Sequence, residues 1–311
     1  SLYVDGTTGD DNNNGLSGTA VKTIQKAVNL VPPIVRHAVT INVAAGTYKS
    51  GWTTVGSSTI MVYIADKVVT ASGSITFQGS SNLAGAPGYR VTGDTNGDST
   101  PDLTSGFYIN RVANVNVRGF QCDYFTQYGI YYGTRADGAP LNCICDNNKR
   151  AGILYIYYSV GFPNTCQANN NGTGAGAAWP QSGIAFVYSS TGNPSNCTAN
   201  GNGAYGILYE EVSIGFPASC TANSNYYSGL TVTVGSTCSP SACNFSLNGT
   251  SGWGYGIYYG TNSLGWPSNC SSPAGNNQSG GLRGDYGSRV DYTIPMPNAN
   301  DATGSASSEV Y

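Results

Sequence analysis

Charged residues are scarce in this sequence. Its 311 residues include only 13 lysines and arginines and 16 aspartates and glutamates, for a formal net charge of −3. A nucleic-acid partner requires a basic surface that neutralises phosphates, so this balance argues against one. The sequence also lacks an apolar run of roughly 18 residues, which a membrane-spanning helix needs, so no membrane span is predicted.

Charge is almost absent from the second half of the chain. Between Ala151 and Leu282 only Glu210 and Glu211 are charged. Soluble proteins normally carry surface charges that keep them apart. We therefore interpret this uncharged flank as a subunit interface, a glycan-contacting face or a glycosylated face. Six Asn-x-Ser/Thr sequons are candidate glycosylation sites: Asn171, Asn196, Asn244, Asn248, Asn269 and Asn277.

In place of charge the sequence has a repeat. Six segments begin with Gly, an aliphatic residue, any residue and usually an aromatic, at Gly129, Gly152, Gly183, Gly206, Gly229 and Gly256. Each is followed by Pro-x-x-Cys, and the six cysteines are spaced 23, 31, 23, 23 and 27 residues apart. A period in the low twenties is too short for a pair of helices and is typical of one coil of a β-solenoid.

The repeat also predicts which side chains fill the solenoid. Side chains alternate along a strand, so the aliphatic residue and the aromatic two places later point to the same side. Stacked coils would place the latter in one inward column: Tyr132, Tyr155, Phe186, Tyr209, Val232 and Tyr259. An Asn three places after the cysteine, such as Asn200 after Cys197, marks the end of a second strand, where stacked amides can bond to one another.

Nine cysteines raise the question of pairing. Seven are assigned to a structural cysteine ladder: Cys122, Cys143, Cys166, Cys197, Cys220, Cys243 and Cys270. Two interpretations stay open: buried thiols that pack as small apolar residues, or disulfides between neighbouring coils. Because nine is odd, at least one thiol stays unpaired or bonds to another chain. Ligands one coil apart in a single column do not form a tetrahedron, which argues against zinc.

The N-terminal segment carries a more specific signal. Apolar residues at helical spacing predict a helix over Thr23 to Val31, which Pro32-Pro33 ends. A strand over Val39 to Val43 and the sequence Ala45-Gly46-Thr47-Tyr48 follow. With Tyr3-Val4-Asp5 upstream, this segment resembles the N-terminal cap and first coil of the pectin-lyase-like right-handed parallel β-helix family. The resemblance implies that the helix plugs the end of the solenoid, since a bare end would expose unpaired strand edges.

The expected fold is therefore all-β: a single-stranded right-handed parallel β-helix of about ten coils with an N-terminal capping α-helix. We divide residues 1–290 into an N-terminal strand and cap helix (1–38), irregular coils (39–127) and regular coils (128–290). Residues 291–311 are expected to form an extended C-terminal tail, which either frays or docks as an arm on a neighbouring subunit.

One loop in the irregular coils has the composition of a calcium site. Oxygen-bearing side chains alternate at Asp94, Asn96, Asp98, Thr100 and Asp102, and hard cations bind several oxygens on a tight loop. The segment resembles the calcium loops of thrombospondin type-3-like repeats, although it lacks their trailing Glu and occurs once. The other interpretation is a polar Asx-type turn. Calcium is the only cofactor that the sequence suggests.

No catalytic constellation is evident in the sequence. Enzymes of the resembled family cluster carboxylates, in some cases with calcium and a basic residue, on one face of the solenoid. Asp123, Asp137 and Asp146 are expected to be solvated turn carboxylates that coils of about 23 residues do not align. Glu211 is expected to lie in a turn, and the single histidine, His37, to be structural.

Three functions fit these observations. The first is a secreted or cell-surface structural protein without catalytic activity, which assembles with itself into an extracellular filament or fibre. The second is a carbohydrate-binding, adhesin-like module that uses exposed tyrosines and Trp179, Trp253 and Trp266 as stacking platforms. The third is a polysaccharide lyase or glycoside hydrolase, which the family resemblance favours and the residues do not.

Overall fold

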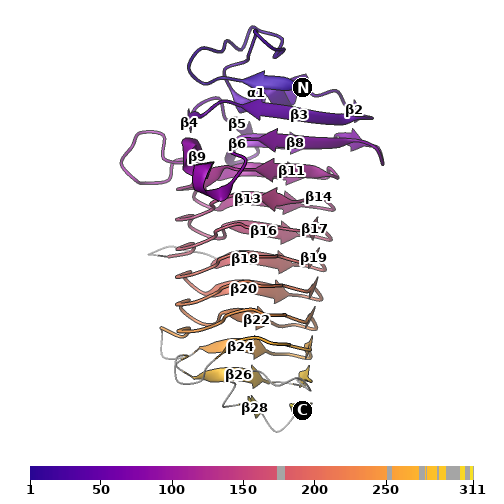
Figure 1. Ribbon diagram of the computed structural model, residues 1–311, viewed down its shortest axis with the longest axis vertical. Coiled ribbons are helices and arrows are strands. Elements are labelled where there is room, and N and C mark those ends of the chain that lie inside the picture. Colours follow the sequence, from indigo (N-terminus) through magenta and orange to yellow (C-terminus); the bar gives the residue numbers. More distant parts are fainter. Residues whose placement is uncertain are drawn as a thin grey trace.

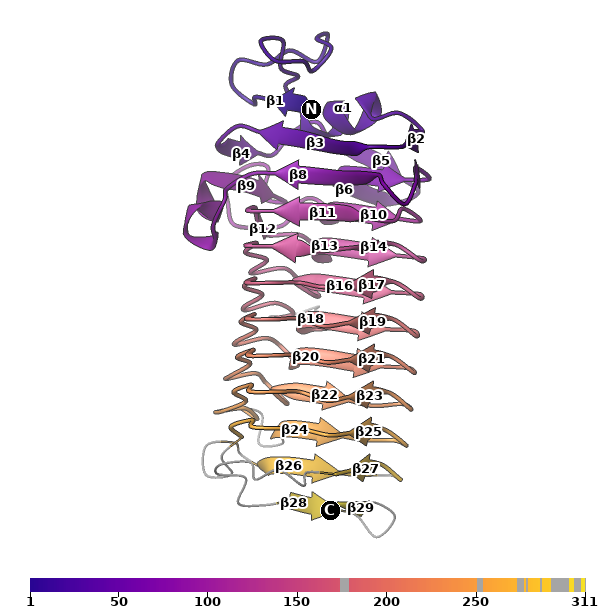
Figure 2. The same cartoon turned by 45° about the vertical axis from the view of Figure 1, so that its right-hand side comes forward.

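Successive turns of the chain stack along one axis into an elongated β-solenoid (Figures 1 and 2). The computed structural model describes residues 1–173, 179–250, 254–272, 277, 279–285, 287–291, 302–304 and 309–310. Two sheets follow the solenoid to its C-terminal end, and we call them the long sheet and the short-strand sheet. Among these residues every strand pair is parallel except the hairpin of β5 with β6.

The long sheet has eleven strands. Ten of them pair in parallel, one from each coil, which confirms the expected number of about ten coils. Its strands are β5 (Thr53–Val55), β6 (Ser58–Ala65), β10 (Ser105–Asn110), β13 (Tyr128–Gly133), β16 (Ile153–Ile156), β18 (Ser182–Val187), β20 (Tyr205–Glu210), β22 (Leu230–Val232), β24 (Tyr255–Tyr259), β26 (Gly280–Gly284) and β28 (Ala302–Gly304).

The short-strand sheet has eight strands of two residues each. They are β14 (Asp137–Gly138), β17 (Val160–Gly161), β19 (Thr191–Gly192), β21 (Ile214–Gly215), β23 (Thr237–Cys238), β25 (Leu264–Gly265), β27 (Arg289–Val290) and β29 (Glu309–Val310). The turn that leads into this sheet has two consecutive residues with positive φ, such as Tyr157 (57°) and Tyr158 (64°). Its recurrence from coil to coil keeps the strands in one register.

The third side of the solenoid holds smaller sheets. A five-stranded sheet contains β1 (Leu2–Val4), β3 (Ala38–Val43), β8 (Ser74–Gln78), β11 (Val115–Arg118) and β15 (Pro140–Leu141), and a three-stranded sheet contains β4 (Gly46–Tyr48), β9 (Tyr89–Thr92) and β12 (Gln121–Asp123). In later coils both continue as single-residue bridges. The remaining elements are the pair β2 (Ile34–Val35) with β7 (Val68–Val69) and a 3-10 helix over Leu83–Gly88.

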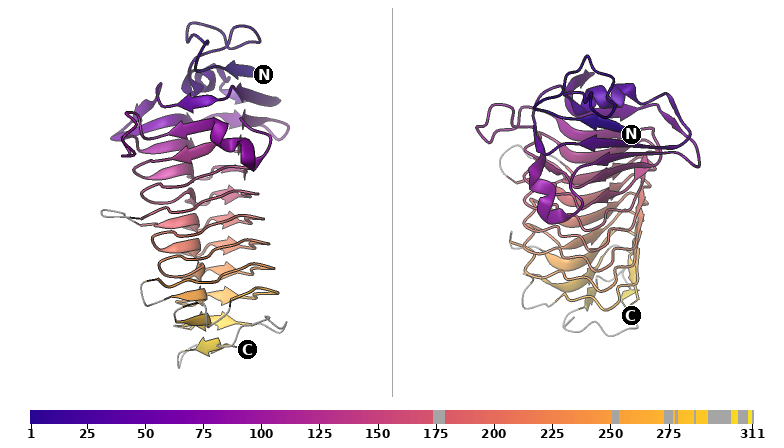
Figure 3. Two further views of the ribbon diagram at one scale, coloured as in Figure 1. Left: turned by 60° about the vertical axis from the view of Figure 1, so that its left-hand side comes forward. Right: turned by 45° about the horizontal axis from the view of Figure 1, so that its top comes forward.

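The predicted cap helix is confirmed as α1 (Ile24–Leu30). It lies over the N-terminal end of the coils (Figure 3) and buries Ile24, Ala27 and Val28 against the core. Its N-cap Thr23 accepts a hydrogen bond from the Lys26 amide. Asp11, in the acidic turn before the helix, accepts hydrogen bonds from both the Thr23 amide and its hydroxyl, so this turn holds the start of the helix in place.

The predicted inward column is confirmed. Tyr132, Tyr155, Phe186 and Tyr209 are fully buried and stack nearly parallel, at an interplanar angle of 8° and ring-centroid distances of 4.7, 4.9 and 5.0 Å. These distances match the spacing between hydrogen-bonded strands. The tyrosine hydroxyls are satisfied inside the solenoid: Tyr209, for example, donates to the Gly192 carbonyl at 2.8 Å.

Each ring is accommodated by a glycine of the short-strand sheet. A Cβ added at Gly161, Gly192, Gly215 or Gly265 would lie 1.8–2.0 Å from the ring of its own coil. In one coil the pair is exchanged, because Val232 stands in the ring column and Cys238 stands at the glycine position. Both are fully buried, so the smaller Val232 leaves the space that the Cys238 thiol fills.

All nine cysteines are free and buried. Cys122 does not extend the Pro-x-x-Cys column, which corrects the expectation from the sequence. Gln121 bridges Ile144, so Cys122 lies beside Cys145, and their thiols interact. The reason is spacing: Cys122 precedes Cys143 by 21 residues, whereas the local register is 23. Burial raises the pKa of Cys122, Cys145 and Cys238, which disfavours reactive thiolates.

The C-terminal segment is not a free tail, which corrects a second expectation. β28 pairs in parallel with β26, and β29 pairs in parallel with β27. The last strands therefore add a further coil to both sheets, because their backbone groups complete the hydrogen bonds of the preceding edge. Asp291 donates its amide to the Gly265 carbonyl at 3.0 Å, and the rest of the expected tail lies outside the described residues.

Candidate functional site

The outward-facing side of the long sheet is rich in tyrosine. The position after the inward aliphatic residue holds, in register from coil to coil, Tyr63, Tyr108, Tyr131, Leu154, Ala185, Leu208, Thr231, Tyr258 and Arg283. Tyr108 and Tyr131 stack with ring centroids 4.0 Å apart. Leu154, Ala185 and Leu208 are buried in an apolar cluster outside the main core. We call this side the tyrosine face.

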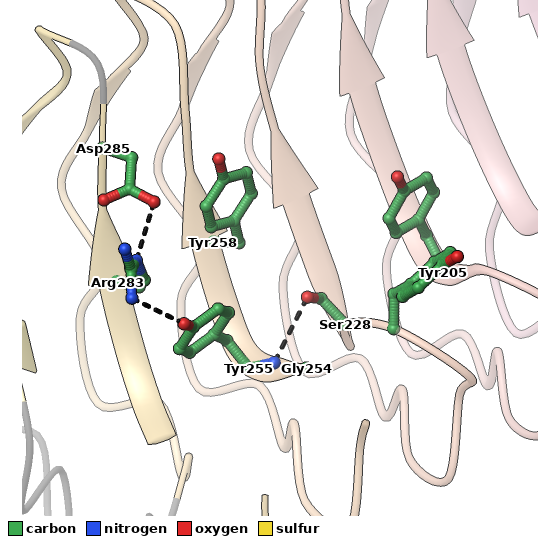
Figure 4. Close-up of a pocket in the computed structure, with 8 residues that line it drawn as sticks. Tyr205, Ser228, Gly254, Tyr255, Tyr258, Arg283 and Asp285 are labelled. Atoms are coloured by element: carbon green, nitrogen blue, oxygen red, sulfur yellow. Dashed lines mark hydrogen bonds and ion pairs between the residues drawn. The ribbon is translucent and has the colours of Figure 1, made fainter. Parts of the chain in front are cut away.

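A pocket of about 340 Å³ lies on this face near its C-terminal end (Figure 4). The residue before the first Gly of each repeat is large at Tyr205 and Tyr255 and small at Ser228 between them, and the short Ser228 side chain leaves the space open. The lining residues are Tyr205, Tyr227, Ser228, Gly254, Tyr255, Tyr258, Arg283 and Asp285.

Arg283 and Asp285 give the pocket its charge. The Arg283 Nε donates to the Asp285 carboxylate at 2.7 Å, and its Nη1 donates to the Tyr255 hydroxyl at 2.8 Å (Figure 4). The Asp285 partner raises the pKa of Arg283. The second carboxylate oxygen of Asp285 is buried without a hydrogen-bond partner among the described residues. Such an atom is costly unless a ligand or water satisfies it.

Aromatic side chains continue the tyrosine face over the middle coils. Tyr157 and Tyr188 stack with ring centroids 5.0 Å apart, and Trp179 meets Tyr188 edge-on at 6.0 Å. The Trp179 indole donates to the Glu210 carboxylate at 2.9 Å, and burial raises the pKa of Glu210. Trp179 thus lies at this face, Trp266 lies exposed after β25, and Trp253 lies outside the described residues.

The structure brings Asp123 and Asp146 together, contrary to the expectation that the coils do not align them. They are 23 residues apart and lie in neighbouring coils two places after the bridged pair Gln121 and Ile144. Asp123 is 1% exposed and forms a two-oxygen ion pair with Arg90 at 2.9 and 3.0 Å, so it is not a solvated turn residue.

Within this pair, Asp146 is the carboxyl whose pKa is raised. Burial and the neighbouring Asp123 carboxylate raise the pKa of Asp146 to about 6, although the Asn169 amide donates to it at 2.6 Å. A carboxyl beside a second carboxylate with a raised pKa is a pattern that general acids share.

The other acidic candidates lie apart from this pair. Asp137 is on β14 of the short-strand sheet. Glu211 lies in the turn after β20 with a positive φ of 55°, which confirms its expected place. His37 is exposed between β2 and β3.

The carboxylates of the suggested calcium loop bind the loop's own backbone. Asp94 accepts hydrogen bonds from the amides of Gly97, Asp98 and Ser99, and Asp102 accepts from the amide and hydroxyl of Thr95. The described residues contain no group of three or more His, Cys, Asp or Glu placed to hold a metal. The hydrogen bonds within the loop therefore satisfy these carboxylates without a metal ion. Calcium binding at Asp94, Asn96, Asp98, Thr100 and Asp102 stays a prediction.

Three of the six sequons are not available for glycosylation in the fold, which corrects the sequence analysis. Asn171, Asn248 and Asn277 are at most 3% exposed. With Asn148, Asn202 and Asn225 they form a buried amide column, in which the Oδ1 of every member after Asn148 accepts from the backbone amide of the preceding member at 2.9–3.0 Å. Asn196, Asn244 and Asn269 are exposed, and their glycosylation stays a prediction.

The buried amide column and the place of Arg283 were not predicted from the sequence, although a sequence pattern marks each of them. The buried amide column follows the cysteine by five places in each coil from Cys143 to Cys243. Arg283 follows Leu282, which pairs with Ile257 at the aliphatic position of the repeat, so the sequence pattern could have placed Arg283 on this face.

Comparison with known proteins places this geometry in a family. A family model described as a right-handed β-helix region matches residues 105–272, more than half of the chain. The chain belongs to the right-handed β-helix family. Among curated proteins no sequence relative was found. No helix of the described part of the chain is long and apolar enough to cross a membrane.

Solved structures with the same fold include three proteins related to carbohydrate chemistry or phage tailspikes. The pectate lyase Pel9A has a TM-score of 0.53 and 15% identity over 97% of this chain and 78% of its own. A rhamnogalacturonan lyase has a TM-score of 0.56 and 12% identity over 100% of this chain and 86% of its own. The enzymatically active domain of the bacteriophage CBA120 tailspike protein 2 has a TM-score of 0.53 and 12% identity over 88% of this chain and 45% of its own. At these identities the likeness establishes the fold alone.

Proposed function

We propose that this chain is a secreted or cell-surface β-helix protein that binds a polysaccharide along its tyrosine face. The observation that carries the proposal is the pocket between Tyr205 and Tyr255, which combines aromatic walls with the Arg283–Asp285 pair. Ligand pockets of a few hundred cubic ångströms typically combine aromatic walls with a few fixed polar groups.

The chemistry of a sugar chain suits this surface. Sugar rings present apolar C–H faces and hydroxyl edges, and tyrosine presents an apolar ring with a polar tip. At the pocket, Tyr205, Tyr227 and Tyr255 come from three neighbouring coils, so a linear polymer can contact more than one coil there. The fold is shared with a pectate lyase and a rhamnogalacturonan lyase, which adds support without identifying the glycan.

Polysaccharide binding to variants of the pocket tests this function. Affinity electrophoresis or calorimetry against a panel of neutral and acidic polysaccharides identifies a ligand first. Tyr255→Ala should then weaken its binding about 10-fold, the effect of losing one aromatic contact of ~1.4 kcal/mol. Phe162→Ala removes an aromatic that is 48% exposed on another side and should leave binding unchanged. Absence of binding across the panel, or equal loss in both variants, would contradict the proposal.

Asp146 supports a second candidate, polysaccharide cleavage. Its raised pKa and its place beside Asp123 resemble a general acid paired with a carboxylate. Asp146→Asn should abolish cleavage of the bound polysaccharide while leaving its affinity within about twofold, the split expected for a group that acts only in the transition state. If the wild-type protein binds and does not cleave, the binding function stands alone.

The filament function stays a prediction. Head-to-tail stacking of coils would require bare ends, and α1 lies over the N-terminal end (Figure 3). Self-association of this chain would therefore involve the flank of the solenoid.

A further inference from the structure

Acidic residues outnumber basic ones in the half of the chain that carries the pocket. After Arg150 the sequence has six acids and two bases, Arg283 and Arg289. Arg283 lines the pocket, whereas Arg289 belongs to β27 of the short-strand sheet, on another side of the solenoid. Among the residues that the structure describes, Arg283 is therefore the only basic side chain of the pocket.

Carboxylates lie at both ends of the pocket along the solenoid axis. Glu210, Thr233, Gly260 and Asp285 align in consecutive coils, as the parallel hydrogen bonds of these strands show. Three coil spacings separate the two carboxylates, roughly 14 Å. Figure 4 shows Tyr205 at the Glu210 end and the Arg283–Asp285 pair at the other. Burial, and next the Glu210 carboxylate, raise the pKa of Tyr205 to about 12, so the charge of Glu210 acts on this wall of the pocket.

The single base of the pocket already has partners. The Arg283 Nε lies 2.7 Å from the Asp285 carboxylate, and the guanidinium lies 5.4 Å from the centre of the Tyr255 ring. A carboxylate ligand at Arg283 would either displace Asp285 or lie beside it as a second like charge. Asp285 is only 6% exposed, so its displacement would leave a buried charge without a partner. Both outcomes are unfavourable.

We propose that the pocket binds an uncharged sugar residue and excludes uronates, in which a carboxylate replaces the primary alcohol of the sugar. This inference names the ligand class of the polysaccharide site and rests on that proposed function. A sugar hydroxyl both donates and accepts hydrogen bonds, whereas a carboxylate only accepts them. The second oxygen of Asp285 has no hydrogen-bond partner among the described residues, and it requires a donor. A hydroxyl supplies that donor and a uronate carboxylate does not.

The polysaccharide panel tests the ligand class. The polymer that binds should be neutral. Oxidation of its primary alcohols to carboxylates keeps its linkages and adds charge, so it should weaken binding at least 10-fold in calorimetry at low salt, because like charges across an interface are unfavourable. An acidic ligand, or affinity that survives the oxidation, overturns this inference while the polysaccharide function stands. Absence of binding across the panel overturns both.

Charge variants of the full chain test the cause. Asp285→Asn keeps the size of the side chain and leaves Arg283 free to attract a carboxylate. The ratio of the Kd values of the oxidised and the native polymer should therefore fall at least 10-fold. Glu210→Gln, at a partly exposed position, should lower the ratio by a smaller factor, and it keeps the test decisive if Asp285→Asn does not fold.

Glu211→Gln is the matched control. Glu211 lies in the turn after β20 and does not line the pocket, so this variant should change the ratio less than twofold. An unchanged ratio in Asp285→Asn and Glu210→Gln, or an equal fall in Glu211→Gln, would show that these two carboxylates do not select the ligand and would overturn the inference.

Discussion

The coils before Tyr128 and the coils after it fill the core of the solenoid with aromatic rings in two different arrangements. In the earlier coils Phe77, Phe107 and Phe120 meet edge-on, with ring centroids 5.1 and 5.2 Å apart and interplanar angles above 60°. Ion pairs such as Arg90 with Asp123 also join neighbouring coils there. After Tyr128 the aromatic rings of equivalent positions stack face to face at 8°, and buried amides replace charges.

The comparison shows that stacking makes each regular coil depend on itself and its two neighbours. A change in one column can therefore be matched within the same coil, as Val232 and Cys238 show. This is the nearest-neighbour behaviour of repeat proteins. In the irregular coils, by contrast, the elements that pack together differ from coil to coil. No neighbouring coil there has an equivalent position that shows which second substitution would compensate for the first.

The largest effect is expected where a ring lies directly against a glycine. Gly215→Ala would place a Cβ 2.0 Å from the Tyr209 ring. We expect it to lower the free energy of unfolding by about 4 kcal/mol or more, since neither the ring nor the stacked strand can move. Urea unfolding followed by circular dichroism measures the change.

Gly88→Ala provides the matched control in the irregular coils. No atom lies within 4 Å of a Cβ added there, so its effect should stay within about 0.5 kcal/mol. The double variant Tyr209→Val/Gly215→Cys copies the exchange of the coil with Val232 and Cys238. Its unfolding midpoint should lie at a higher urea concentration than that of Gly215→Ala. The reverse order would contradict the explanation that the smaller Val232 leaves the space that Cys238 fills.

The sequence predicted the regular coils well because their signal is repetition. The ring column and the helix over Thr23 to Val31 followed from spacing, and the capping role of this helix was implied by the resemblance to the pectin-lyase-like family. Asp123 and Asp146 share that spacing, but Asp137 between them belongs to another sheet, so the three aspartates together do not fit one period. Arg90 could not be paired with Asp123 in advance, since irregular coils have no period that connects residues 33 positions apart.

The second prediction contrasts the two asparagine columns of one coil. Asn202 is 1% exposed, accepts from the Asn171 amide and donates to the Asn225 side chain. Asn202→Ala leaves buried partners unsatisfied, so we expect a loss of about 3 kcal/mol. Asn200→Ala, two residues away, removes one bond to the Asn223 amide at a partly exposed position and should cost about 1 kcal/mol. Equal losses in urea unfolding would show that burial does not separate the columns.

The third prediction uses pH to test the junction between the two regions. The folded pKa of Asp146 is about 6, above its ordinary value of 3.8, so the folded state binds the proton more tightly. Stability from this group is full below about pH 4 and falls as pH rises to about 6. Asp146→Asn continues the column of Asn169 and Asn200 and carries no charge to desolvate. It should gain about 1–2 kcal/mol at pH 7.5 and nothing at pH 4.

Urea unfolding of both proteins at the two pH values gives the measurement. A gain of equal size at pH 4 would mean that the amide forms a better hydrogen bond and that charge is not the cause. A loss at pH 7.5 would mean that the Asp146 carboxylate is stabilised in the fold, and its role as a raised-pKa acid would be wrong.

The smallest effect is expected at the loop from Asp94 to Asp102. Its carboxylates already accept backbone hydrogen bonds, so a calcium ion would have to displace these. We expect the melting temperature to change by less than about 1 °C between excess calcium and chelator, whereas a site filled at 100 times its Kd would add about 2.7 kcal/mol. Asp94→Ala, which removes three amide acceptor bonds, should lower the melting temperature equally in both conditions. A calcium-dependent rise in the melting temperature that Asp94→Ala abolishes would establish a metal site. The sequence pattern alone would then have predicted this irregular loop correctly, as it did the regular coils.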